Sequence, residues 1–162
     1  MQEKVTIRKI CAKDDASIAV IIRQSLEDFN AVKQGTVYFD KTTDHLFGLF
    51  QVSNATYFIA EINETIVGGG GIYPTNGLGE NTCELVKMYV ASAARGKGIG
   101  KLLLNECIAE ARASGYSSMY IETMPELTNA IEMYKKNGFK FIPKALGNSG
   151  HVGCDLFMLK HL

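Results

Sequence analysis

The stretch Glu84-Leu-Val-Lys-Met-Tyr-Val-Ala-Ser-Ala-Ala-Arg-Gly-Lys-Gly-Ile-Gly-Lys-Leu-Leu-Leu104 decides how the chain folds. Its first part predicts a strand over 82–90, and apolar residues at four-residue spacing predict a helix over 98–114. Between them, glycines allow several backbone N–H groups to converge where the start of the helix adds positive potential. The segment is therefore typical of an anion site that suits a pyrophosphate.

Three classes of phosphate-binding loop can be compared with this turn. A Walker A loop requires GxxxxGK and then Ser or Thr, but Gly96 to Lys101 is one residue short and Leu102 replaces the hydroxyl. A Rossmann loop requires GxGxxG early in a βαβ unit, whereas the pattern here is GxGxG after four predicted strands. Both classes fit poorly. The residues predicted to hold the anion are Arg95, Gly96, Lys97, Gly98, Ile99, Gly100 and Lys101.

A third class fits. Arg95-x-x-Gly-x-Gly100, after a strand that ends Met-Tyr-Val90, resembles the acetyl-CoA-binding signature of the GNAT superfamily, Gln/Arg-x-x-Gly-x-Gly/Ala. Downstream, Asn129-Ala-Ile131 and Tyr134-Lys-Lys-Asn-Gly-Phe139 resemble the second signature of that family. One predicted helix and one predicted strand separate the two motifs, as the family requires. The resemblance covers about 82–142 closely, and the N-terminal third matches only in element order.

The resemblance implies acetyl-CoA as co-substrate, no metal, and direct transfer of the acetyl group from a ternary complex. It implies that the strands holding Val90 and Ile121 splay apart, so that backbone at Met88 and Val90 binds the pantetheine arm. An N–H at Val90 would face the thioester oxygen. Packing in the core is the other interpretation of both side chains. Asn129 is either a helix-capping residue or a ligand of the pantetheine amides, and we favour the ligand.

Two residues are candidates for the chemistry. Attack requires a neutral amine, so a base must help at neutral pH. Glu84 matches the general-base glutamate of histone-acetylating members of the superfamily, and two-residue alternation predicts that it shares a face with Val90. A carboxylate paired with a lysine at a strand entrance is the alternative, and Lys87 is predicted on the opposite face. Tyr134 matches the tyrosine that lies near the departing sulfur, although a helical Tyr is more often a core residue.

The sequence says less about the residues that bind the acceptor. In the resembling family the loop between the last two strands often borders the acceptor, and here that loop holds His151. A lone His in a polar loop is more often a solvated surface residue. Cys154 nearby makes a Cys–His nucleophile conceivable, but nothing else in the sequence supports it. We expect the 30–45 and 143–154 loops to select the acceptor.

The remaining periodicity completes an α/β pattern. Predicted strands cover about 4–10, 57–62, 66–73, 118–123, 139–142 and 154–159, and predicted helices cover 18–29, 43–51 and 129–136. The run Gly68–Gly71 lies inside a strand, where glycine indicates a bulge or close approach of other groups. The order favours a GNAT-type mixed sheet of about seven strands flanked by about four helices and splayed at the cofactor site.

Composition sets further expectations. The 162 residues predict a single domain over 1–162. Lys plus Arg equal Asp plus Glu at 17 each, which indicates a small-molecule or peptide partner and no nucleic acid. No apolar run suggests a signal peptide or a membrane partner, so we expect a cytoplasmic monomer or homodimer. The four cysteines have no zinc spacing, and most should be small buried apolar residues.

The sequence thus predicts an N-acetyltransferase that acts on a primary amine of a small molecule, peptide or protein. One alternative is a catalytically silent module that binds acyl-CoA as a sensor, and retention of Glu84, Asn129 and Tyr134 argues against it. A second is a nucleotide-binding protein. The acceptor itself stays open among amino acids, polyamines, aminoglycoside-like compounds, peptide N-termini and protein lysines.

Overall fold

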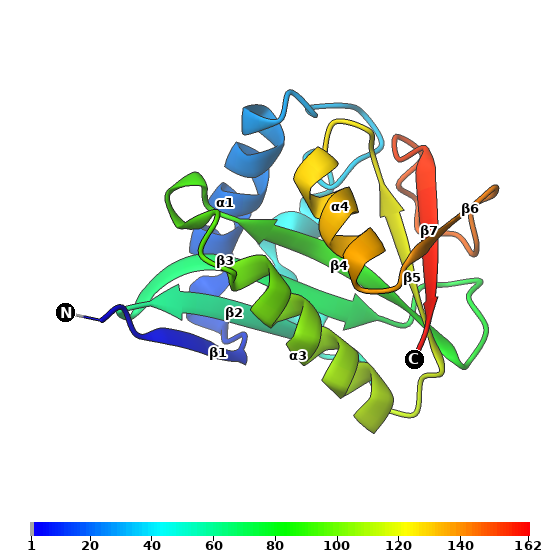
Figure 1. Cartoon of the computed structure of the whole chain (residues 1–162), viewed down its shortest axis with the longest axis horizontal. Coiled ribbons are helices and arrows are strands. Elements are labelled where there is room, and N and C mark those ends of the chain that lie inside the picture. Colours follow the sequence, from blue (N-terminus) through cyan, green and yellow to red (C-terminus); the bar gives the residue numbers. More distant parts are fainter. Residues whose placement is uncertain (1) are drawn as a thin grey trace.

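The computed structural model describes residues 2–162 and contains one seven-stranded mixed sheet (Figure 1). The strands are β1 (Val5–Lys9), β2 (Thr56–Ile62), β3 (Thr65–Tyr73), β4 (Thr82–Val90), β5 (Ser118–Thr123), β6 (Lys140–Ile142) and β7 (Leu156–His161). The helices are α1 (Asp15–Asp28), α2 (Leu46–Leu49), α3 (Ile99–Ala113) and α4 (Thr128–Lys136). The strand order is β1-β2-β3-β4-β5-β7-β6, and β4–β5 is the parallel pair. The predicted fold class is confirmed.

Helices cover both faces of the sheet (Figure 1). On one face, α3 and α4 pack on the sheet through a core that includes Ile99, Leu103 and Tyr134. On the other face, α1 and α2 pack through a second core that includes Ile18 and Leu46. Each helix buries one apolar stripe and leaves its other side to solvent. No helix among residues 2–162 has the length and apolar character needed to cross a bilayer.

The sheet opens between its two parallel strands. The β4–β5 ladder has only three residue pairs, from Thr82–Ser118 to Glu84–Tyr120. Beyond Glu84 the two strands diverge, because β4 continues along β3 while β5 continues along β7. The predicted splay is therefore present, and it leaves one edge of each strand unpaired over the last residues.

A bulge in β4 lies beside this opening. Val86 pairs with Gly71 and Tyr89 pairs with Gly69, so the β4 residues between them have one residue too many for the ladder. Lys87 takes a left-handed conformation with φ of 51°. A bulge of this kind changes which face the following side chains occupy.

The bulge corrects two sequence predictions. Cys83, Leu85, Met88 and Val90 contact the core under α3 and α4, whereas Val86 and Tyr89 contact the core under α1. By alternation, Glu84 lies on the α1 face, and Val90 does not share it. Lys87 also lies on the α1 face, since its ammonium contacts Asp40 in the loop after α1. The expectation that Glu84 and Val90 share a face was wrong, and so was the placement of Lys87 opposite Glu84.

The glycine run in β3 supports the bulge by allowing close approach. A Cβ atom at Gly69 or at Gly71 would lie 2.7 Å from the ring of Tyr57 on β2. The Tyr57 hydroxyl passes this point and donates a 2.7 Å hydrogen bond to the carbonyl oxygen of Lys87. The predicted close approach is confirmed, and its effect is to hold the bulged peptide in place.

The second helix is shorter than predicted. Instead of a helix over 43–51, the chain forms a 3₁₀ turn at Lys41–Asp44 and then the single-turn α2. Asp40 caps the 3₁₀ turn, because its Oδ1 accepts a 2.9 Å hydrogen bond from the Thr42 N–H. His45 then leaves helical geometry with φ of −136° and ψ of 46°. The 18–29, 98–114 and 129–136 helices are confirmed with bounds shifted by a few residues at their ends.

Candidate active site

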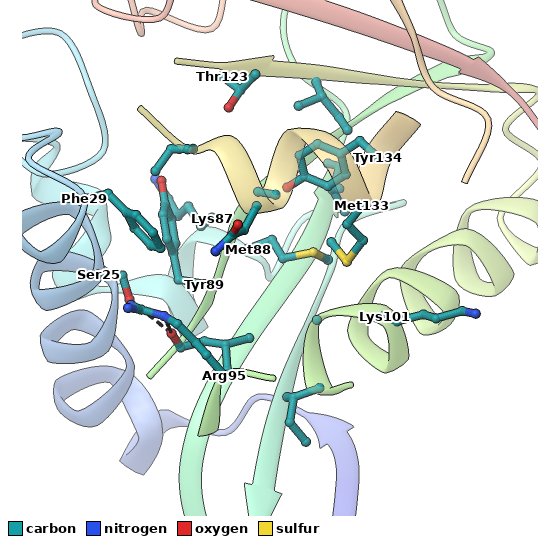
Figure 2. A pocket seen from close by; sticks show the side chains of 18 of the residues that line it. Ser25, Phe29, Lys87, Met88, Tyr89, Arg95, Lys101, Thr123, Met133 and Tyr134 are labelled. Carbon is teal, nitrogen blue, oxygen red and sulfur yellow. Dashed lines mark hydrogen bonds between the residues drawn. The ribbon is translucent and has the colours of Figure 1, made fainter. Parts of the chain in front are cut away.

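A cavity of about 420 Å³ passes through the opening between β4 and β5 (Figure 2). Its walls include side chains from both faces of the sheet: Leu85, Met88, Ile121 and Tyr134 from the α3 and α4 face, and Lys87, Tyr89 and Glu122 from the α1 face. The cavity therefore joins the two faces at the point where the parallel ladder ends. It also reaches the glycine-rich turn before α3, since Gly96, Gly98 and Gly100 line it.

The turn end of the cavity is made of backbone. Gly96 and Gly98 have φ of 80° and 78°, and Gly98 stands at the N-cap of α3. A Cβ at either position would meet no protein atom within 4 Å, so the room beside these glycines is open. The first N–H groups of a helix have no partner inside the helix, and those of α3 begin directly after Gly98, beside that room. This arrangement fits the predicted anion site.

Arg95 and Lys101 are among the residues that line the cavity, but the charged groups of Arg95 and Lys97 already have acidic partners within the protein. Arg95 donates from Nε to the Val90 carbonyl at 2.9 Å and from Nη2 to Asp28 Oδ2 at 3.1 Å. Lys97 pairs with Glu3 at 2.7 Å and is not among the lining residues. Figure 2 shows the Lys101 side chain extending away from the cavity along the outside of α3. Arg95 thus links the turn to Val90 and Asp28, and the start of α3 has the N–H groups and helix dipole that suit an anion.

Two predicted pantetheine-binding positions also line the cavity. Met88 and Val90 lie on the unpaired part of β4. The Ala91 N–H bonds to the Val67 carbonyl at 2.7 Å, on the β3 side. Because consecutive residues of an antiparallel pair alternate between bonded and non-bonded positions, the Val90 N–H is directed at the opening. Both side chains pack on the core as well, so the packing interpretation and the cavity position hold together.

Asn129 is an exposed residue that lines the cavity from the first turn of α4. The helix begins at Thr128, and Leu127 occupies the N-cap position. The helix-capping alternative for Asn129 was therefore wrong. Its amide remains free to bind a ligand, since it forms no side-chain hydrogen bond with any of residues 2–162.

Tyr134 presents a free hydroxyl to the cavity (Figure 2). The residue is 5% exposed, and its ring packs edge-on against Phe139 at a centroid distance of 5.7 Å. Its hydroxyl has no hydrogen-bond partner within the described part of the chain. Burial raises the pKa of the phenol well above its usual value, so the hydroxyl keeps its proton and can donate it.

Glu84 lies on the other side of the opening and is 3% exposed. Its Oε1 accepts a 2.8 Å hydrogen bond from the Thr75 hydroxyl. Burial, reinforced by the negative charge of Glu122, raises the pKa of Glu84 to about 7. A carboxyl group with this pKa can both take and release a proton near neutral pH. Glu84 does not itself line the cavity, so it would act through a neighbour or a water.

Glu122 occupies that neighbouring position and was missed by the sequence analysis. It lines the cavity from β5, on the α1 face. Its Oε2 accepts a 2.7 Å hydrogen bond from the Tyr120 hydroxyl, and its Oε1 accepts one from Ser149. Its position next to Ile121, in the strand predicted to splay from β4, could have indicated that Glu122 lines the opening. A single acidic residue in a predicted strand is too common to be chosen on that ground.

The two loops expected to select the acceptor lie against each other. The Gly153 N–H donates to the Gly35 carbonyl at 2.8 Å. His151 Nε2 lies 2.9 Å from Asp40 Oδ2, which joins the 143–154 loop to the 30–45 loop beside the α1 face. His151 does not line the cavity, and its contact is with Asp40.

Cys154 gives no support to a Cys–His nucleophile. Burial raises the pKa of its thiol to about 12, so the group is a thiol at neutral pH. Its backbone N–H contacts the His151 carbonyl, but within the described chain the imidazole ring contacts Asp40. Cys83 and Cys107 are fully buried, as expected of small apolar residues, but Cys11 and Cys154 are half-buried, so the prediction holds for two of the four cysteines and not for most of them.

Comparison with known proteins identifies the family. Residues 21–139 match the family described as "Acetyltransferase (GNAT) family". The uncharacterized N-acetyltransferase YjgM of Escherichia coli K12 is 36% identical over 157 residues, covering 96% of this chain and 94% of YjgM.

Solved structures share the fold. A GNAT-family acetyltransferase from Staphylococcus aureus has a TM-score of 0.84 and 22% identity, covering 98% of this chain and 99% of that one. The PaiA N-acetyltransferase of Thermoplasma acidophilum, solved with coenzyme A, has a TM-score of 0.78 and 21% identity over the same shares. With its splayed sheet, its glycine-rich helix start and its sequence match, the chain belongs to the GNAT acetyltransferase family.

Proposed function

We propose that the protein transfers the acetyl group of acetyl-CoA directly to a primary amine of a small molecule, peptide or protein. The observation that carries the proposal is the cavity through the sheet. One end has a helix start that suits a pyrophosphate, and the other has the half-buried carboxylate of Glu122, with buried Glu84 behind the wall, which suits an ammonium group. A thioester held in the opening would be reachable from the α1 face.

The donor side would use backbone groups. N–H groups at the start of α3 would bind the pyrophosphate, with room supplied by Gly96 and Gly98. The unpaired edge of β4 at Met88 and Val90, and the Asn129 amide, would bind the pantetheine arm. The Val90 N–H, directed at the opening, would stabilise negative charge on the thioester oxygen during attack. The PaiA structure, which has the same fold and was solved in complex with coenzyme A, supports the proposal that this fold binds coenzyme A.

On the acceptor side, Glu84 would serve as the base. Ammonium must lose a proton before nitrogen can attack, and a carboxyl group with a pKa of about 7 takes that proton near neutral pH. Glu84 is behind the cavity wall, so the proton would travel through a water or past Glu122. The charge of Glu122 would also attract the cationic acceptor.

The reaction balances without a covalent enzyme intermediate. The amine nitrogen forms a bond to the acetyl carbon, the carbon–sulfur bond breaks, and the amine proton goes to Glu84. Tyr134 would donate to the departing sulfur, because its hydroxyl is protonated and unpaired within residues 2–162. The protonated state of the Cys154 thiol favours direct transfer over an acyl-cysteine.

Turnover with a panel of primary amines tests the proposal. Thiol release from acetyl-CoA is followed while mass spectrometry detects the N-acetylated product in equal amount, with matched alcohols as the control. We expect product with amines and none with alcohols. Tight binding of coenzyme A without acetylation of any amine would contradict the proposal and favour a silent acyl-CoA sensor.

A further inference from the structure

Lys87 is a buried cation that the proposed reaction does not use. It stands at the β4 bulge, is 6% exposed, and lines the cavity on the α1 face. Tyr57 fixes its carbonyl oxygen, so the position of its backbone is set. Taking an ammonium group out of water is costly unless partners replace the lost hydration. Its presence at a cavity wall therefore calls for partners.

The protein supplies few of them. The ammonium group has three donors. Within residues 2–162 it makes one polar contact, to Asp40 Oδ2 at 3.4 Å, which is long for a charged pair. Asp40 has closer partners: the Thr42 N–H at 2.9 Å, the Thr42 hydroxyl at 2.7 Å and His151 at 2.9 Å. Asp40 is satisfied without Lys87, whereas the donors of Lys87 are largely unused.

The unused donors of Lys87, and not a net positive charge, would attract an anion. Asp40 Oδ2 receives contacts from both Lys87 and His151, so the three groups together are neutral, or carry one positive charge when the imidazole is protonated. Glu122 lines the same cavity as Lys87, and Glu84 lies behind the cavity wall close enough to interact with the charge of Glu122. Two side chains of opposite charge, Lys87 and Glu122, therefore lie on one face of the opening.

We infer that Lys87 binds a carboxylate of the acceptor, and that the protein acetylates amines that carry a carboxylate beside the amine, as amino acids do. The inference rests on the proposed function. A zwitterionic acceptor would place its ammonium group by Glu122 and Glu84 and its carboxylate by Lys87. A diamine would bring a second cation toward Lys87, and a neutral amine would leave the Lys87 donors without partners.

Matched acceptors test the inference. Several free amino acids are compared with their C-terminal amides and with a simple diamine, by kcat/KM for thiol release. An α-amino amide loses its ammonium proton more readily than the free amino acid, so the chemistry alone favours the amide. We expect the free acids to exceed the amides by ~10- to 100-fold, as a charge-assisted pair of hydrogen bonds would provide.

Variants assign the preference to Lys87. Lys87→Met keeps an unbranched side chain one atom shorter and without the charge, and it should remove the preference by lowering kcat/KM for acids only. Lys87→Arg keeps the charge and should retain part of the preference, which gives a second measurement if the Met variant is unstable. The exposed Lys13→Met variant is the control and should behave as the wild type.

The outcomes separate this inference from the proposed function. Turnover in which amides or the diamine equal or exceed the acids would overturn the carboxylate site and leave amine acetylation intact. A preference for acids that survives Lys87→Met would overturn the role of Lys87. Absence of turnover with every amine, with coenzyme A binding retained, would overturn the proposed function and this inference with it.

Discussion

The two ends of the cavity are built in different ways. The end at α3 comes from one continuous segment, Arg95–Lys101, and consists of glycines and the N–H groups of a helix start. On the α1 face the side chains come from distant segments: Lys87 and Glu122 line the cavity, and Asp40, Glu84 and His151 lie behind its wall. A site made of backbone groups from one segment can be predicted from a sequence motif. A site made of side chains from distant segments can be predicted only once the arrangement of the strands is known.

The same difference suggests that one end of the cavity binds the cofactor and the other end binds the acceptor and moves its proton. The backbone end suits a cofactor that carries a pyrophosphate, because such a site needs only glycines at fixed spacing and a helix start. The side-chain end can change its charge through single substitutions without disturbing the first end. Variants at the two ends should therefore separate loss of coenzyme A binding from loss of chemistry.

The largest effect is expected at Glu84. Glu84→Gln removes the base and keeps an oxygen that can accept from Thr75. We expect kcat to fall by ~10²- to 10⁴-fold, as general bases typically contribute. The wild-type rate should rise with pH through about 7, the pKa to which burial raises Glu84, and this acidic limb should be absent in the variant. Coenzyme A affinity, measured by calorimetry, should not change.

Stability provides the control for Glu84→Gln. A folded-state pKa of about 7, raised from 4.5, means that the folded protein holds a proton that the unfolded chain releases. Stability should therefore fall as pH rises from about 4.5 to about 7, and an uncharged Gln should remove this loss. At pH 8 the Gln variant should be the more stable by up to roughly 3–4 kcal/mol, since the pKa shift from 4.5 to about 7 is worth about 1.4 kcal/mol per pKa unit. The exposed Glu80→Gln should change neither rate nor stability.

The next effect concerns the opposite end. Gly98→Val should weaken coenzyme A binding by about 100-fold or more, because the side chain fills open room beside the first N–H groups of α3 and several hydrogen bonds are lost. Gly115→Val is a matched control: its φ is 88° against 78° at Gly98, and neither Cβ meets an atom within 4 Å. Both variants should lose stability by backbone strain. Equal coenzyme A affinity in the two would mean that the turn is not the pyrophosphate site.

A smaller effect is expected at Tyr134, where the two ends meet. Tyr134→Phe removes only the free hydroxyl and keeps the packing against Phe139. We expect kcat to fall by ~10-fold or more with acetyl-CoA affinity retained, since a hydrogen bond to charge developing on sulfur acts in the transition state. Single-turnover rates distinguish chemistry from product release. An unchanged single-turnover rate would exclude Tyr134 from the reaction.

The smallest effect concerns Tyr57, which lies outside the cavity wall and holds the bulge. Tyr57→Phe leaves the Lys87 carbonyl without its donor, so we expect a loss of about 1–3 kcal/mol in unfolding free energy and a severalfold lower kcat. Tyr116→Phe removes a comparable 2.9 Å bond, to the Asn54 carbonyl, away from the opening. It should lower stability without lowering kcat. A Tyr57→Phe enzyme with full activity would show that the active conformation of the bulge does not depend on the hydrogen bond from Tyr57 to the Lys87 carbonyl.

Sequence reasoning predicted most of the fold and the backbone end of the site. Periodicity located β4 and β5 at their observed bounds, and the glycine spacing located the start of α3. The prediction failed at Lys87, where strict alternation was assumed through β4 and the bulge reversed it. The glycine run in β3 signalled a bulge or close approach, but not which residue of the neighbouring strand would be displaced.

The acceptor end was mostly unpredictable for a different reason. Glu122 and Asp40 are ordinary acidic residues in a strand and a loop. The sheet order brings Glu122 near Glu84, and the path of the loop after α1 brings Asp40 to Lys87. The raised pKa of Glu84 likewise depends on burial and on Glu122. Such properties belong to the folded arrangement, so a single sequence without its fold does not display them.

The central claim is that donor and acceptor meet through the opening between β4 and β5. Initial velocities measured while acetyl-CoA and an accepted amine are both varied test it most directly. Direct transfer in a ternary complex predicts double-reciprocal lines that intersect, with no thiol burst when the amine is omitted. Parallel lines, together with a stoichiometric burst of thiol from acetyl-CoA alone, would indicate an acetylated enzyme and contradict the account.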